Sequence, residues 1–239
     1  MKIIDANLRN NFLEGLKNKR RSKSYAQKIS SRLIKNNNDI LAACFDVYNS
    51  GIIFPQGGAL AKRKETPNID VILVNLANKI YAYFMNKENA SISEQCFDKF
   101  HADCCNSFIN SINSARASVG YAPIYYGSAQ KMVNMIFKYL VCYQDYADYA
   151  NYFKWCHMPI DTVILRWLKE RYQIRDIYYR VSINFKGKEE LFANYKKKTW
   201  TKFDETLYRD ILSLIREKIN ADLDFAGRSR LDVEFSIWG

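Results

Sequence analysis

The sequence predicts a mainly α-helical protein, and two observations lead to this prediction. Apolar residues recur at helical spacing along most of the 239 positions, and only 9 Gly and 4 Pro interrupt them. Hydrophobic residues make up 48% of the chain, which is enough for a packed core. We expect a helical bundle with a cleft, formed either by a single domain over 1–239 or by two lobes. In the second arrangement one lobe takes about 1–115 with the C-terminal helix 204–239, and the other takes about 116–200.

Each expected helix begins where a polar side chain able to cap it precedes an apolar-periodic run. The candidate caps are Asn68 or Asp70, Ser91 or Ser93, Ser128, Asp161 and Asp204. The helices are expected over 5–18, 24–36, 38–48, 69–86, 92–115, 128–146, 161–172 and 204–219. The stretch GIIFPQGGAL (51–60) reads as a loop because Gly and Pro interrupt helices.

Two segments depart from the helical period. IYYRVSINF (177–185) and LDVEFSIW (231–238) alternate apolar and polar residues with a period of two, which is typical of strands. They could pair as a small β ribbon near the C-terminus. Alternatively, the second segment is an extended tail packed across helices.

The charge of the chain favours an anionic polymer as partner. Lys and Arg number 36 against 25 Asp and Glu, so the net charge is +11, with basic clusters at 17–23, 62–64 and 196–198. The 17 Tyr, 14 Phe and 4 Trp offer flat faces on which bases could stack, although aromatic residues also build cores. Composition thus favours nucleic acid over acidic or neutral partners.

The sequence shows no sign of a membrane or secretory protein. No window approaches the roughly 18 uncharged apolar residues that a span needs, and MKIIDANLRNNF lacks an apolar core followed by a cleavage site. We expect a cytoplasmic protein with no membrane contact and no obligatory protein partner.

The six cysteines include no CxxC pair and are expected to be reduced and mostly buried. Cys96, His101, Cys104 and Cys105 crowd together, but a zinc or iron–sulfur site needs a fuller set of ligands at regular spacing. Core cysteines are therefore favoured over a metal site, and no metal or cofactor is expected, although the sequence alone does not decide whether this cluster binds metal.

The stretch YGSAQKMVNMIFKYL (126–140) contains the first candidate for chemistry. Its polar residues form one narrow stripe of Lys131, Asn134 and Lys138, at positions i, i+3 and i+7. One interpretation is that the stripe is the exposed edge of a core helix. The other is that Lys131, placed near the positive end of a helix, has a chemical role.

Asp161 is the second candidate, in the segment CHMPIDTVILRWL. Pro159 ends any preceding helix, so Asp161 is well placed to cap the next one. Capping alone would account for an aspartate here, because an N-cap stabilises its helix by roughly 1 kcal/mol.

Together, the two segments resemble the helix-hairpin-helix DNA glycosylases, whose members carry a G-x-G-x-K-T-A-N hairpin and a later V-D-T-H-V-x-R run. GSAQKMVN and IDTVILR keep Gly127, Lys131, Asn134, Asp161, Thr162, Ile164 and Arg166. Ala129 replaces the second hairpin glycine, Val163 replaces the common His, and the four-cysteine cluster of some members is lacking. The wide separation of Lys131 and Asp161 is closer to that of the archaeal 8-oxoguanine glycosylases. The match covers 126–168.

This resemblance implies a helix-hairpin-helix element near 115–140 and a DNA glycosylase that flips a damaged or modified base out of double-stranded DNA. Lys131 would be the nucleophile, with AP lyase activity, and Asp161 would stabilise the sugar cation. It also implies further site residues. DNA contacts are expected from Gly127, Ser128, Gln130 and Arg166, and base-pocket contacts from Tyr125, Tyr126, Trp155 and His157.

General chemistry gives an independent reason for the pairing, because a lysine amine can attack C1′ and a carboxylate can stabilise the charge developing there. The alternative is a non-catalytic helical protein that binds DNA or RNA through its basic surface. A protein-interaction module is a third reading. Repair and defence against modified phage DNA are both open as roles, as is the identity of the base.

Overall fold

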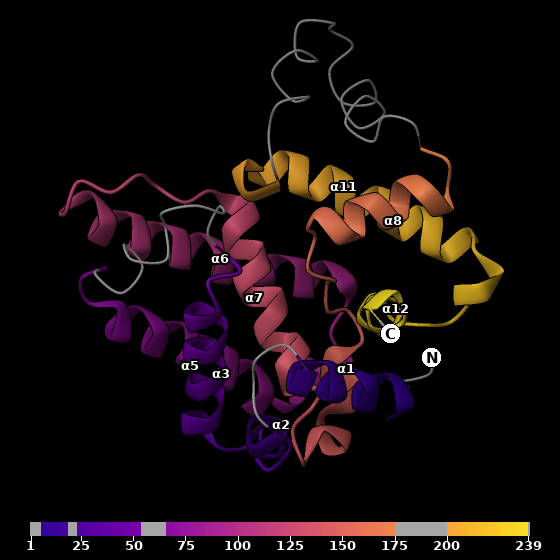
Figure 1. The fold of residues 1–239 in the computed structure, drawn as a ribbon, viewed down its shortest axis with the longest axis horizontal. Coiled ribbons are helices and arrows are strands. Elements are labelled where there is room, and N and C mark those ends of the chain that lie inside the picture. The colour runs from indigo at the N-terminus through magenta and orange to yellow at the C-terminus, as the bar shows by residue number, and fades with distance from the viewer. Residues whose placement is uncertain (1–5, 19–22, 54–65, 175–199, 239) are drawn as a thin grey trace, which may run out of the picture.

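The computed structural model describes residues 6–18, 23–53, 66–174 and 200–238. The prediction of a mainly helical bundle is confirmed, and the described ranges contain no β-strand (Figure 1). The proposed division into two lobes stays a prediction.

The helices described in the first half of the chain lie between residues 6 and 117. They are α1 (Ala6–Asn18), α2 (Lys23–Ser30), α3 (Asn37–Ser50), α5 (Ile69–Met85) and α6 (Glu94–Ala117), with the 3₁₀ helix η1 (Lys87–Ser91) before α6. Ser93 caps α6, because its side chain accepts a hydrogen bond from the Cys96 amide. Asn68 precedes α5 with φ of 55° and makes no side-chain cap.

The second half carries both candidate site segments. Its helices are α7 (Tyr126–Leu140), η2 (Tyr146–Phe153), α8 (Thr162–Arg171), η3 (Trp200–Lys202), α11 (Glu205–Ala221), η4 (Leu223–Phe225) and α12 (Arg230–Trp238). Asp161 and Asp204 cap α8 and α11 through their side chains, as predicted. Ser128 does not cap α7, because the helix already begins at Tyr126.

Helix α7 lies at the centre of the fold. It contacts α3, α6, α11 and η3, and Figure 1 shows it running through the middle of the molecule. Every residue from Tyr126 to Leu140 is buried. The expectation that Lys131, Asn134 and Lys138 form an exposed edge is therefore wrong.

Aromatic side chains pack around α7. Phe137 lies 5.7 Å from Phe97 and 5.8 Å from Phe84, measured between ring centroids, and Tyr83 stacks on Phe100 at 4.5 Å. Such contacts add to the burial of the rings themselves. These aromatics build the core and are not available for stacking on bases.

The segment 231–238 is helical, so the predicted strand or extended tail there is wrong. Its alternating polar residues, Asp232 and Glu234, suggested one exposed face, but both are buried with Leu231 and Val233. Asp232 pairs with the partly exposed Arg228 and Glu234 pairs with the buried Lys138, so the period-two pattern does not mark a solvent-facing side. The other candidate strand, 177–185, lies outside the described residues.

Two other boundaries differ from the prediction. α2 ends at Ser30 and not near 36, and α7 ends at Leu140 and not near 146. After α7 the backbone turns, and the Gln144 amide donates to the Arg32 carbonyl. The bounds of the remaining helices agree with prediction to within about two residues.

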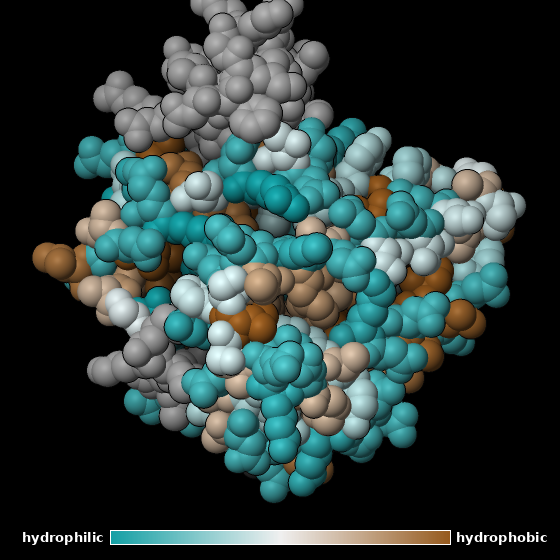
Figure 2. Space-filling model, turned by 180° about the vertical axis from the view of Figure 1, so that it is seen from behind, coloured by the Kyte–Doolittle hydropathy of each residue, from teal (hydrophilic) through white to brown (hydrophobic). Residues whose placement is uncertain are grey.

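The surface seen in Figure 2 is largely hydrophilic, with small hydrophobic patches between polar side chains. Within the described ranges no helix is both long and apolar enough to cross a membrane. The clusters 62–64 and 196–198 and most of 17–23 fall outside those ranges.

Candidate active site

Lys131 and Asp161, 30 positions apart in sequence, are in direct contact. Lys131 Nζ donates a hydrogen bond to Asp161 Oδ2 at 2.5 Å, and the two side chains are 6% and 12% exposed. Because both side chains are largely removed from water, solvent and salt screen this contact less than they screen a surface ion pair. The fold therefore brings together the two groups singled out in the sequence.

The local sequence of α8 explains how Asp161 serves two partners. Its Oδ1 accepts hydrogen bonds from the amides of Val163 and Ile164, at 2.8 and 3.1 Å, and so caps the helix. This arrangement leaves Oδ2 to face Lys131. Capping and ion pairing thus use different oxygens of one carboxylate.

Lys131 lies in the second turn of α7, because the helix starts at Tyr126. The sequence placed it in the first turn, where free N–H groups disfavour a cation. That penalty falls off within the first turn, so the cation is stabilised here by Asp161 and is not simply exposed to a helix end.

The rest of the polar stripe on α7 is also paired. Lys138 Nζ lies 2.6 Å from Glu234 Oε1 of α12, with side chains 2% and 1% exposed. Burial lowers the pKa of Lys138, while Glu234 opposes this change. The Lys138 ammonium also lies 4.4 Å from the centre of the Phe12 ring, a cation–π contact.

The start of α7 is covered by the segment 200–203. The Gly127 amide donates to the Phe203 carbonyl at 2.9 Å, and Ser128 Oγ lies 3.5 Å from the Thr201 carbonyl oxygen. In this conformation protein carbonyls occupy the positions that a phosphate would need, and the expected hold on a DNA phosphate by Gly127 and Ser128 stays a prediction.

Gln130 was expected to contact DNA, but its side chain is fully buried. Its amide group bonds to main-chain atoms of Gly127 and Ile160. Its expected DNA contact therefore stays a prediction that would require these bonds to open. Arg166 differs, because it is exposed on α8, five residues after Asp161.

The four base-pocket candidates are not gathered in one open site. Tyr126 is buried against Tyr208, with ring centroids 5.3 Å apart, and His157 is buried as well. Trp155 is half-buried, and its indole N–H donates to the Ile92 carbonyl. Tyr125 is 47% exposed and is the one candidate of the four on the surface.

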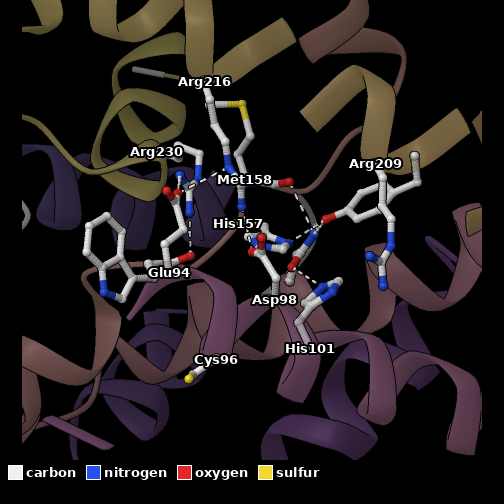
Figure 3. A network of polar contacts seen from close by, with 12 residues as sticks. Glu94, Cys96, Asp98, His101, His157, Met158, Arg209, Arg216 and Arg230 are labelled. Atoms are coloured by element: carbon white, nitrogen blue, oxygen red, sulfur yellow. Dashed lines mark hydrogen bonds and ion pairs between the residues drawn. The ribbon is translucent and has the colours of Figure 1, made fainter. Parts of the chain in front are cut away.

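A buried polar network links α6, α7 and α11, and Figure 3 shows it from close by. His157 contacts Asp98 and Tyr208 at 2.8 Å each, Tyr208 contacts Asn134, and Asn134 contacts His101 at 2.9 Å. Burial is the main reason that the pKa of both histidines lies well below the usual value. The neighbouring His157 lowers the pKa of His101 further, and the positive charge of Arg230 lowers that of His157. Both rings are therefore neutral near pH 7.

Two arginines, Arg216 of α11 and Arg230 of α12, extend this network. Arg216 pairs with Asp98 at 2.5 Å, and Arg230 pairs with Glu94 and donates to the Trp155 carbonyl at 2.6 Å. Figure 3 shows these groups converging around His157. They tie α12 and α11 to α6.

The cysteine and histidine cluster forms part of the core. Cys104 and Cys105 are buried, the Cys105 sulfur lies 3.8 Å from the ring nitrogens of His101, and Cys96 is exposed. Burial raises the pKa of Cys104 to about 12. In the described part of the chain no group of three or more His, Cys, Asp or Glu is arranged to hold a metal ion.

The sequence analysis named Gln130 and Asn134 but not the partners they take here, and it missed Tyr208 and Glu234. The i, i+3, i+7 stripe on α7 was a signal for Asn134 and Lys138, but nothing in the sequence said that it faced protein. Searches against protein families, curated proteins and solved structures gave no match for the chain.

Proposed function

We propose that the protein is a DNA glycosylase with AP lyase activity, in which Lys131 is the nucleophile and Asp161 its partner. The observation that carries the proposal is the 2.5 Å contact between the two side chains. The resemblance of 126–168 to the helix-hairpin-helix glycosylases supports it, and so does the net charge of +11.

The chemistry requires Lys131 to lose a proton before it reacts, and Asp161 Oδ2 is in position to accept that proton. The Nζ lone pair then forms a bond to C1′ of the flipped nucleotide. The bond between C1′ and the base breaks, its electron pair leaves with the base, and the base takes up the proton that Asp161 accepted, which restores the Asp161 carboxylate. Asp161 stabilises the positive charge that develops on the sugar.

For this reaction the C1′ atom of a nucleotide must reach Lys131 Nζ. The two side chains are nearly enclosed, so a sugar carbon reaches Nζ only after part of the covering structure moves. The exposed residues Tyr125, just before α7, and Arg166, in the middle of α8, are proposed to meet the DNA.

Borohydride trapping tests the proposal. Borohydride reduces the imine between a lysine and an opened sugar to a stable amine, so a lysine nucleophile leaves a covalent protein–DNA adduct. Duplexes should each carry one damaged base, with 8-oxoguanine and other oxidised purines first because of the archaeal resemblance. The adduct should map to Lys131 by peptide mass spectrometry, and it should be absent from Lys131→Ala.

Two further variants sharpen the test. Asp161→Asn keeps an oxygen for capping α8 but loses the proton acceptor, so adduct formation should slow by roughly 100-fold or more. Lys169→Ala removes an exposed lysine from the same helix and should leave the rate unchanged. If no damaged duplex gives an adduct while the protein still binds DNA, the non-catalytic alternative is correct. An adduct on another lysine refutes the role of Lys131.

A further inference from the structure

The side chain of Gln130 joins α7 to the turn that carries Asp161. Its Nε2 donates to the Ile160 carbonyl at 2.7 Å, and its Oε1 accepts from the Ile160 amide at 3.1 Å. One amide thus holds both main-chain groups of a single residue, as a neighbouring β-strand would. Gln130 is fully buried, so water cannot replace these bonds without opening the core.

Asn134, one turn further along α7, extends the same connection. Its Nδ2 donates to the Met158 carbonyl at 3.2 Å and to Gln130 Oε1 at 3.0 Å. The two amides together therefore hold the main chain on both sides of Pro159, which has no amide hydrogen to contribute.

The orientation of Asn134 is itself fixed. Because its nitrogen faces acceptors, its oxygen faces His101, and His101 Nε2 must carry the hydrogen of that 2.9 Å contact. Tyr208 accepts from Asn134 and can donate to His157, whose other nitrogen faces Asp98. Each donor in this chain meets an acceptor, so neither amide can flip without leaving a buried polar atom unpaired.

The residues that form this connection are the sequence neighbours of Lys131 and Asp161. Gln130 directly precedes Lys131, and Ile160 directly precedes Asp161. The hydrogen bonds between Gln130 and Ile160 therefore set the distance and direction between Lys131 and Asp161. We infer that Gln130 and Asn134 are positioning residues that hold Asp161 against Lys131. The effect on catalysis rests on the proposed function, whereas the effect on the geometry does not.

The structure offers a matched control for this inference. Asn113 holds Ile124 in the same way, accepting from its amide at 2.8 Å and donating to its carbonyl at 3.0 Å. This second connection fixes the approach to α7 and does not contact the turn of Asp161. Gln130→Met and Asn113→Leu each remove one such connection and keep most of the side-chain volume.

Hydrogen exchange gives a measurement that needs no DNA. The amides of Val163 and Ile164 are protected by Asp161 Oδ1, so their exchange reports the position of that carboxylate. We expect Gln130→Met to speed their exchange by about 10-fold or more relative to other α8 amides, and Asn113→Leu to leave that ratio unchanged. Equal acceleration along the whole of α8 in both variants would overturn the inference.

Adduct formation gives the second measurement. Gln130→Met should slow single-turnover trapping by at least about 10-fold at saturating DNA, with less than about 2-fold change in DNA affinity, and Asn113→Leu should do neither. Gln130→Glu keeps the acceptor for the Ile160 amide but turns an oxygen toward the Gly127 and Ile160 carbonyls, so it should affect both measurements at least as much as Gln130→Met. This variant also serves if Gln130→Met does not fold.

The two proposals fail in different ways. If wild type gives no adduct but the exchange of Val163 and Ile164 responds as expected, the proposed function is wrong and the positioning role stands. If wild type gives an adduct and Gln130→Met matches it in trapping rate and in exchange, the positioning role is wrong and the function stands.

Discussion

Lys138 and Glu234 form an ion pair 2.6 Å long in the interior, between the last turn of α7 and the C-terminal helix α12. Removal of one partner from a buried pair leaves the other charge without compensation. Lys138→Met is therefore expected to lower the free energy of unfolding by about 3–5 kcal/mol.

The double variant Lys138→Met with Glu234→Leu tests whether this cost comes from the stranded charge. It should regain most of the stability that the single variant loses, because well-packed apolar side chains often replace a buried pair at little cost. Urea denaturation of the wild type, both single variants and the double variant gives the coupling energy. Additive losses would show that the two residues act independently.

Gly127 is expected to resist any side chain. A Cβ built there would lie 1.8 Å from the Trp200 carbonyl oxygen, which is main chain and cannot rotate away. Gly127→Ala should displace η3 and cost about 1–3 kcal/mol, as overpacked core variants do. Ser128→Ala is the control, since it loses only the 3.5 Å contact with Thr201 and should cost less than about 1 kcal/mol. Equal effects in urea denaturation would contradict the close approach.

Stability should fall as the pH is lowered from 6.5 to 5. The pKa values of His101 and His157 are lowered in the folded protein, chiefly by burial, so in this window the unfolded chain binds more protons. Their contribution to stability is present above the unfolded pKa of about 6.5 and is lost below it. The two histidines together should change the free energy of unfolding by up to about 2.7 kcal/mol per pH unit.

The variant His101→Gln provides the control for this pH dependence. A glutamine can still donate to Asn134 but does not titrate, so the slope should drop to about half. Urea denaturation at intervals of 0.5 pH unit measures it. A flat profile in the wild type would mean that the histidines are accessible to protons in the folded state.

The thiols should react with a colorimetric thiol reagent in two classes. Cys96 is exposed, whereas Cys44, Cys104, Cys105, Cys142 and Cys156 are buried with raised pKa values. Reactivity requires thiolate and access, so one equivalent should react quickly in the native protein and six after unfolding. Cys96→Ser should abolish the fast class.

Sequence reasoning succeeded where the cause was local. The cap at Asp161 follows from Pro159 and the apolar run after it, and Ser93, one of two serines predicted as a cap, precedes a helix of apolar period. The choice of Lys131 and Asp161 as one pair came from their spacing and the resemblance, and the two side chains do meet.

Sequence reasoning failed where a polar residue meets a partner far along the chain. A stripe such as Lys131, Asn134 and Lys138 has the same spacing whether it faces water or buried partners. Its partners come from positions 161, 208 and 234, and no local pattern connects these. LDVEFSIW misled for the same reason, since Glu234 was read as solvent-facing when it faces Lys138.

The enclosure of α7 has a consequence for mutational tolerance. A helix at a surface accepts most substitutions on its outer side, but every one of the positions from Tyr126 to Leu140 is buried, and several polar ones hold specific partners. In a saturation library selected for folded protein, substitutions should be depleted at every position of α7. In α8 they should be depleted mainly at the buried positions Ile164 and Leu168. The activity measured for any α7 variant must accordingly be divided by the fraction of that variant that is folded. Only a loss that remains after this correction assigns a chemical role to the residue.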